Sequence, residues 1–292
     1  MAIGVAGWSY PDWKGYVYEG RVKDPLRYLA GFVDLIEINN TFYRMPEARM
    51  AEDWARRTAD LPAFFFSAKL HQDMTHEGRF RREAARAFSE GFRPLREAGK
   101  LRHLLAQFRY DFRDEPGNRD LLRQIAEAFA GQAVLVLELR HGSWQSPEAL
   151  GFIGGLGVAL AHLDYPAGPE GFALDVCPVG EDAYLRLHGR NRAAWYDRNA
   201  GRDETYNYDY SRKELEEIRD RALRLARRFR STTIVANNHY HGKEVANALQ
   251  LMALLGRKAV KAPEVLRRRY PNLAQVSVAA AGDSETKEQW LF

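Results

Sequence analysis

Eight short apolar runs of strand length alternate along the chain with longer segments of helical periodicity, and no other feature limits the fold as strongly. The runs span residues 2–8, 35–39, 64–70, 103–108, 133–140, 158–163, 183–189 and 232–239. Strands that alternate with helices are expected to be parallel. Eight such units within 292 residues predict a (β/α)8 barrel, and a doubly wound open sheet is the alternative.

The segments between these runs have the residue spacing of amphipathic helices. Four of them span residues 47–59, 80–98, 118–130 and 243–255. The clearest helix is expected after Ser211, because Ser211 and Glu214 form a capping box and an apolar face follows. The interval between residues 163 and 183 shows no such pattern, so the sixth β/α unit is expected to be irregular.

The chain is expected to form a single domain. Its hydrophobic content of 46% is sufficient for a large core, and no linker, low-complexity run or internal repeat divides it. We expect the barrel to occupy residues 1–278. Residues 279–292 are small and polar for most of their length and are expected to form a mobile tail.

Charge and cysteine content exclude several classes of protein. The net charge is only +4, with acids and bases interspersed, which gives no global signature of nucleic-acid binding. Cys177 is the only cysteine, so an intramolecular disulfide or a cysteine metal cluster is excluded. The N-terminus enters a strand-like run without a basic leader, and no apolar stretch reaches the length of a membrane span. A cytoplasmic location is therefore expected.

Polar side chains stand at the C-terminal end of most predicted strands, on the face opposite the aliphatic residues. Ile36 and Ile38 share one face, for example, whereas Glu37 and Asn39 share the other. The same alternation selects, at the other strand ends, Lys69, Gln107, Glu138, Arg140, Arg186 and His188, and the last strand ends at Asn237, Asn238 and His239. Active sites of barrel enzymes lie at this end of the strands, so the pattern predicts a polar pocket at the C-terminal mouth.

A purely structural interpretation of the same residues is open. Pairing of Glu37, Glu138 and Asp164 with Lys69, Arg140 and Arg186 would neutralise these charges inside the mouth. A hydrophobic plug would fill the mouth without the cost of desolvating charges. Charge pairing alone therefore does not explain why polar residues stand at the end of most predicted strands.

Six stretches that follow one another along the chain carry a family resemblance. They are GWSYPDWKGYVY, EINNTFYRMP, FFFSAKLHQDMTH, LELRHGSW, LRLHGRN and NNHYHGKEVANA. In this order they resemble the DUF72, or YecE-like, family from Gly4 to about Ala248. The resemblance implies a TIM barrel and supplies no established activity.

The resemblance also implies a set of site residues. The candidate catalytic groups are Glu37, Lys69, Glu138 and His188. The candidate substrate-binding groups are Trp8, Asn39, Tyr43, His76, Gln107, Arg140, His141, Trp144, Arg186, Arg190, Asn237 and Asn238. No residue is assigned as a metal ligand.

The first functional hypothesis is an enzyme that acts on an anionic or phosphorylated small molecule. Arginine suits bidentate capture of carboxylate or phosphate, and Arg140, Arg186 and Arg190 are available for it together with Lys69. Glutamate and histidine supply acid/base groups. Hydrolysis, isomerisation and lyase chemistry all stay open.

The second hypothesis is a divalent-metal-dependent hydrolase or isomerase. Glu138, Asp164, His188 and His239 offer mixed oxygen and nitrogen ligands, although no tight metal-binding spacing supports them. The cofactor is therefore unknown. No P-loop, no G-x-G-x-x-G after a strand and no G-x-S-x-G is present, so no nucleotide cofactor is expected.

The third hypothesis is a non-enzymatic module that binds nucleic acid. The segment between residues 190 and 210 mixes arginines with aromatic residues, a composition typical of single-strand stacking platforms. The residues are Arg190, Arg192, Arg198, Arg202, Trp195, Tyr196, Tyr206 and Tyr208. Nearby acidic residues dilute the charge, and a long loop at this end of a barrel strand favours a lid.

Overall fold

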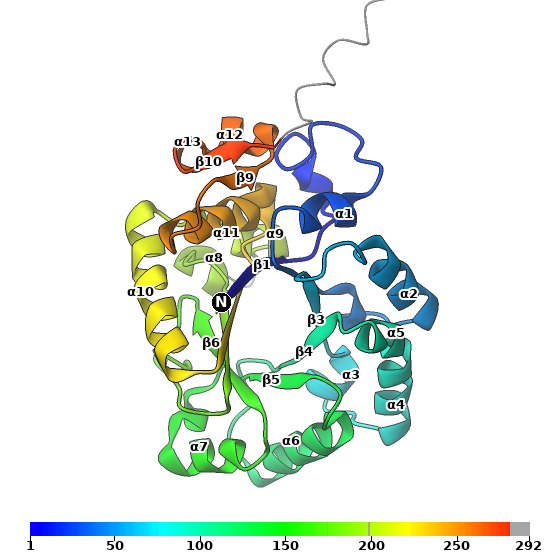
Figure 1. The fold of residues 1–292 in the computed structure, drawn as a ribbon. Coiled ribbons are helices and arrows are strands. Elements are labelled where there is room, and N and C mark those ends of the chain that lie inside the picture. Colours follow the sequence, from blue (N-terminus) through cyan, green and yellow to red (C-terminus); the bar gives the residue numbers. More distant parts are fainter. Residues whose placement is uncertain (174, 198, 281–292) are drawn as a thin grey trace, which may run out of the picture.

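Eight parallel strands close into a barrel in the computed structural model, which describes residues 1–173, 175–197 and 199–280 (Figure 1). They are β1 (Ala2–Ala6), β2 (Leu35–Ile38), β3 (Phe65–Lys69), β4 (Leu101–Gln107), β5 (Val134–Glu138), β6 (Ala159–Asp164), β7 (Asp182–Leu187) and β8 (Ser231–Ala236). Each strand pairs with the next, and β8 pairs with β1. The predicted (β/α)8 barrel is confirmed.

Helices surround the barrel on its outside (Figure 1). The main ones are α1 (Pro25–Ala30), α2 (Ala48–Arg57), α3 (Gln72–Thr75), α4 (Arg82–Gly91), α5 (Arg93–Glu97), α6 (Pro116–Phe129), α7 (Pro147–Gly154), α10 (Arg212–Arg228) and α11 (Lys243–Leu254). Four 3-10 turns follow strand ends: η1 (Pro11–Trp13), η2 (Asn40–Phe42), η3 (Gly142–Gln145) and η4 (Tyr240–Gly242). The capping box predicted at Ser211 and Glu214 is present at the start of α10.

One predicted helix is two helices in the structure. The periodicity over residues 80–98 is continuous, but α4 and α5 meet at Phe92. Pro94 explains the break, because proline has no N–H to donate to the carbonyl four residues earlier and its ring clashes with that carbonyl.

The sixth unit is irregular, as predicted. No helix lies between β6 and β7 in the described residues 165–173 and 175–181. Part of this segment is fixed to the end of β5, where the Phe172 N–H donates to the Arg140 carbonyl at 2.8 Å. Cys177 is buried, and its N–H donates to Nε2 of His162 at 3.0 Å.

The C-terminal part of the described chain packs beside α11 (Figure 1). It contains β9 (Val260–Ala262), α12 (Glu264–Arg269), α13 (Pro271–Ala274) and β10 (Ser277–Ala279), and β9 pairs with β10. The domain boundary expected after residue 278 stays a prediction, because β10 ends at Ala279 and residues 281–292 of the expected tail lie outside the described residues. None of the helices built from the described residues has the length and apolarity needed to cross a membrane.

The barrel interior has an apolar layer beneath a polar one. Leu35, Phe65, Leu105 and Val136 belong to a cluster inside the barrel, separate from the larger core between strands and helices. Because side chains alternate along a strand, residues two positions further along face the interior nearer the mouth. The strands thus direct polar groups toward the C-terminal mouth.

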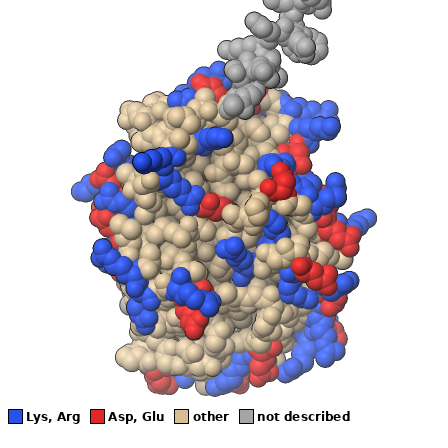
Figure 2. Space-filling model, viewed as in Figure 1, with Lys and Arg blue, Asp and Glu red and all other residues tan. Residues whose placement is uncertain are grey.

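The opposite end of the barrel, which carries the N-terminus, is seen in Figure 2. Basic and acidic side chains are interspersed over this face, in agreement with the small net charge. A broad hollow of about 1080 Å³ lies at this end, with Arg102, Arg230, Glu181 and Asp182 at its walls. Because acidic and basic side chains are mixed in its walls, the hollow favours neither anionic nor cationic ligands. The strand ends that carry the predicted site lie at the other end.

Candidate functional site

A pocket of about 520 Å³ lies at the C-terminal mouth of the barrel. Its wall is formed by Gly7, Trp8, Ser9, Tyr10, Pro11, Asn39, Asn40, Tyr43, Lys69, Gln107, Arg186, Arg202, Tyr206, Asn237 and His239. The residues come from the ends of β1, β2, β3, β4, β7 and β8 and from the segment after β7, which contains α8 (Arg192–Tyr196) and α9 (Arg202–Thr205). Several strands therefore converge on one site, as the alternation predicts.

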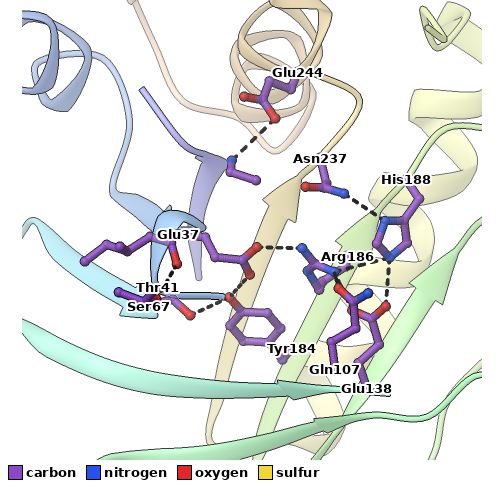
Figure 3. Close-up of polar contacts among 12 residues, drawn as sticks. Glu37, Thr41, Ser67, Gln107, Glu138, Tyr184, Arg186, His188, Asn237 and Glu244 are labelled. Atoms are coloured by element: carbon purple, nitrogen blue, oxygen red, sulfur yellow. Dashed lines mark hydrogen bonds and ion pairs between the residues drawn. The ribbon is translucent and has the colours of Figure 1, made fainter. Parts of the chain in front are cut away.

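Arg186 is at the centre of the polar layer (Figure 3). Its Nη2 donates to Oε1 of Glu37 at 2.5 Å, and its Nη1 donates to Oε2 of Glu138. Oε2 of Glu37 is hydrogen-bonded to the Tyr184 hydroxyl at 2.8 Å, and this hydroxyl lies 2.8 Å from Oγ of Ser67. Arg186, Glu37 and Glu138 have almost no exposed surface, so the guanidinium bridges two buried carboxylates across the barrel.

Glu138 stays ionised although it is buried. Burial alone would raise the pKa of its carboxyl, but the charges of Arg186 and Arg140 outweigh burial and hold the pKa well below its usual range. Arg140 donates to Oε1 of Glu138 from Nε at 2.9 Å and from Nη2 at 2.7 Å. One carboxylate thus neutralises part of the charge of two arginines.

His188 is a neutral group next to this carboxylate. Burial lowers the pKa of His188 to about 4, against the attraction of Glu138, whose Oε1 lies 3.4 Å from Nε2. The other ring nitrogen, Nδ1, lies 3.0 Å from the amide nitrogen of Asn237. An Asn237 amide that donates to Nδ1 leaves the ring proton on Nε2, where it points to Glu138.

Lys69 differs from the arginines because its charge is not paired directly. Among the described residues, no hydrogen bond or ion pair holds its ammonium, which lies 4.1 Å from the centre of the Phe42 ring. Burial lowers the pKa of Lys69, Arg186 lowers it further, and Glu138 and Glu37 oppose this, with a result of about 7. Lys69 is therefore partly neutral at physiological pH.

Aromatic residues form the rest of the wall. Tyr10 stacks on His239 with ring centres 4.6 Å apart, and Tyr206 lies 5.4 Å from the same imidazole. Neither ring nitrogen of His239 has a hydrogen-bond partner among the described residues, and burial lowers its pKa to about 4. Arg202 lies over the Tyr10 ring at 5.7 Å. His239 thus offers one N–H donor and one nitrogen acceptor in the pocket wall.

The structure brings together most of the residues predicted from the sequence. Seven of them line the pocket: Trp8, Asn39, Tyr43, Lys69, Gln107, Arg186 and Asn237. Glu37, Glu138, Arg140 and His188 lie behind Arg186 in the network of buried charges. His76 packs edge-on against Phe42, with ring centres 4.8 Å apart. Burial is the main cause that lowers the pKa of His76 to about 4, and the positive charge of Lys69 acts in the same direction.

Four other predicted residues have structural contacts away from the pocket. His141 caps η3 through Ser143, and the Trp144 indole N–H donates to the Phe112 carbonyl at 2.8 Å. The Asn238 amide donates to Oδ1 of Asn247 on α11 at 2.8 Å. Arg190, the fourth, binds Asp164 from Nε at 3.0 Å and from Nη2 at 2.8 Å, and it reaches Glu217 on α10.

The sequence prediction omitted Tyr10, Arg202, Tyr206 and His239 from the substrate-binding set. Tyr10 both packs on Trp13 and lines the pocket. Arg202 and Tyr206 come from the long segment after β7, where no strand alternation indicates direction. The only signal for them is the Arg and Tyr content of that segment.

The residues of the other two hypotheses are only partly brought together. Asp164 binds Arg190 and the Tyr210 hydroxyl, and the described residues contain no group of three or more His, Cys, Asp or Glu side chains arranged to hold a metal. The tyrosines proposed as stacking surfaces contact the protein itself: the Tyr196 hydroxyl donates to the Pro166 carbonyl and that of Tyr208 to Glu214. Arg198 lies outside the described residues.

Comparison with known proteins identifies the family. The model of the family described as "Protein of unknown function DUF72" matches residues 2–271. The chain belongs to the DUF72 family. Among DUF72 relatives, the UPF0759 protein YunF of Bacillus subtilis (strain 168) is 27% identical over 268 residues, which cover 87% of this chain and 94% of YunF.

Solved structures agree with this DUF72 assignment. A DUF72 family protein from Thermotoga maritima superposes with a TM-score of 0.77 and 31% identity, over 88% of this chain and 99% of the other. A D-psicose 3-epimerase from Clostridium cellulolyticum H10 has a TM-score of 0.52 and 11% identity, over 95% of this chain and 98% of the enzyme. At this identity the likeness to the epimerase concerns the fold alone.

Proposed function

We propose that this DUF72 protein is an enzyme that acts on an anionic small molecule, carboxylated or phosphorylated, by acid/base chemistry at the C-terminal mouth. The observation that carries the proposal is the charge of the pocket wall. Among the described residues that line it, Lys69, Arg186 and Arg202 are the charged ones, and none is Asp or Glu. The two central carboxylates lie behind Arg186, so an entering ligand meets cationic groups first.

The groups beside this cationic wall suit proton transfer. Glu138 is ionised, His188 is neutral, and Lys69 has a pKa of about 7. Acid and base roles divide in this way when environments move the pKa values of neighbouring groups apart. Amides of Asn39, Gln107 and Asn237 line the same pocket and can orient hydroxyl or carbonyl groups of a substrate.

The test is a calorimetric titration of the purified chain with sulfate and with inorganic phosphate at low ionic strength. We expect saturable binding that Arg202→Gln weakens about tenfold, which corresponds to ~1.4 kcal/mol. Arg82→Gln is the matched control, because Arg82 is exposed on α4 and pairs with Glu127. Binding that is absent, or that both variants weaken equally, would contradict the proposal.

A further inference from the structure

Lys69 has the surroundings of an amine nucleophile. Its backbone is fixed at the end of β3, where the carbonyl accepts a 2.7 Å hydrogen bond from the Thr41 hydroxyl. Its side chain reaches the pocket and lies over the Phe42 ring. A carboxylate salt bridge would hold a lysine in its charged form, and none is present for Lys69 among the described residues. The wall therefore presents an amine whose lone pair is available to a bound molecule.

The other charges near Lys69 suit a cationic intermediate at its nitrogen. Arg186 and Arg140 repel the lysine ammonium, whereas Glu37 and Glu138 attract it. Burial lowers the pKa of Lys69, and together with these charges the result is about 7, so the neutral amine is more abundant at pH 7 than for an unperturbed lysine. The same two carboxylates would also stabilise the positive charge of an iminium formed at this nitrogen.

We infer that Lys69 forms an imine with the substrate, and that this substrate is a small aldehyde or ketone that carries a carboxylate or phosphate group. The inference rests on the proposed function, because it names the substrate class for the same pocket. The anionic group would lie against Arg186 and Arg202, and its carbonyl carbon would face Nζ of Lys69. An imine withdraws electrons from the neighbouring carbon, which assists proton abstraction or carbon–carbon cleavage there.

The chemistry of the step balances without a further reactant. The nitrogen lone pair attacks the carbonyl carbon, and the π electrons of the C=O bond move to oxygen. A proton passes from nitrogen to this oxygen to give a carbinolamine. The oxygen takes one more proton from solvent and leaves as water, while the nitrogen lone pair forms the C=N bond of the iminium.

Reductive trapping on the full chain tests the inference. The protein is incubated at pH 7 with sodium cyanoborohydride and one of three probes: glyoxylate, glycolaldehyde phosphate or formaldehyde. The reductant converts an imine into a stable secondary amine, which peptide mass spectrometry locates. We expect the Lys69 peptide to be labelled before that of the exposed Lys23, and Lys69→Arg to lose this label while its thermal melting stays that of a folded protein.

The three probes separate failure of this inference from failure of the proposed function. Faster labelling by either anionic probe than by formaldehyde, slowed by added sulfate, supports both, and the faster of the two identifies the preferred anion. If sulfate binds but no probe labels Lys69, the imine is overturned and the anion-binding function stands. If formaldehyde labels Lys69 and neither anionic probe labels it faster, the proposal of an anionic carbonyl substrate is overturned.

Discussion

Arg186 and Glu37 form a buried ion pair inside the barrel, with Nη2 of the guanidinium 2.5 Å from Oε1 of the carboxylate. Both side chains are at most 1% exposed. Arg186 also holds Glu138, so one guanidinium bridges two acids that come from opposite parts of the barrel. Removal of this cation would leave buried Glu37 without an ion-pair partner, whereas Glu138 would keep Arg140.

This pairing predicts a large loss of stability for Arg186→Met. We expect the free energy of unfolding to fall by about 3–5 kcal/mol, because breaking a buried pair leaves an uncompensated charge. Urea unfolding followed by circular dichroism measures it. Arg82→Met on the exposed surface of α4 is the control and should change little. Equal effects of the two substitutions would show that the buried pair contributes no more than a surface pair.

The sequence predicted the central part of this arrangement because strand alternation is a strict rule. In a parallel barrel each second residue faces inward, so Glu37, Lys69, Glu138, Arg186 and His188 are selected together once the strands are recognised. The alternation does not predict which of these charged groups pair with one another. Glu138 is shared by Arg186 and Arg140, whereas Lys69 has no acid in direct contact among the described residues.

The side-chain placements that alternation does not predict have a common physical cause. Beyond the last paired residue the chain turns, and alternation no longer indicates direction. Gly189, with φ of +88°, reorients the chain after His188, and Arg190 then faces Asp164 and α10 instead of the pocket. Arg202 and Tyr206 reach the pocket from α9 and the turn after it, through tertiary packing that no local pattern indicates.

Buried histidines predict that the protein loses stability in mild acid. Burial lowers the pKa values of His103, His162, His188 and His239 to about 4 in the folded chain, against about 6.5 in an unfolded chain. Between pH 6.5 and 4 the unfolded chain therefore binds protons that the folded chain does not. The stability is fully present above pH 6.5 and falls as the pH drops through this window.

Chemical denaturation at pH 7, 6 and 5 measures this effect. His162→Gln is an informative variant, because His162 packs against Phe229, away from the pocket, and its Nε2 accepts from the Cys177 N–H. Glutamine retains an acceptor but does not titrate. We expect the variant to show a shallower pH dependence than the parent protein. A stability that is constant from pH 6.5 to 5 would refute the assignment of neutral buried histidines.

Titration of Lys69 predicts that anion binding weakens as the pH rises. Sulfate keeps its charge between pH 6 and 8, whereas Lys69 loses its proton around pH 7. We expect the sulfate affinity to fall about tenfold over this range, or ~1.4 kcal/mol. The neighbouring His76 and His239 are already neutral there, with pKa values of about 4. Calorimetric titration at several pH values provides the measurement.

Lys69→Arg is the matched variant for this pH dependence. Arginine stays charged across the range, so the sulfate affinity of the variant should be independent of pH. A variant that retains the pH dependence of the parent protein would assign the effect to another group. A parent protein without pH dependence would show that Lys69 does not contact the anion.

Arg190 is predicted to stabilise the fold without contributing to anion binding. Its guanidinium binds both oxygens of Asp164 and one oxygen of Glu217, and so joins the end of β6 to α10 behind the pocket. Arg190→Met should lower the free energy of unfolding by about 1–3 kcal/mol, because it removes hydrogen bonds between charged and partly buried groups. Its sulfate affinity should equal that of the parent protein.

Arg202→Gln should show the opposite result, with weaker sulfate binding and nearly unchanged stability, because Arg202 lines the pocket and its side chain is 55% exposed. Urea unfolding and calorimetric titration of both variants separate these roles, and a loss of sulfate affinity in Arg190→Met as large as that in Arg202→Gln would place Arg190 in the binding site.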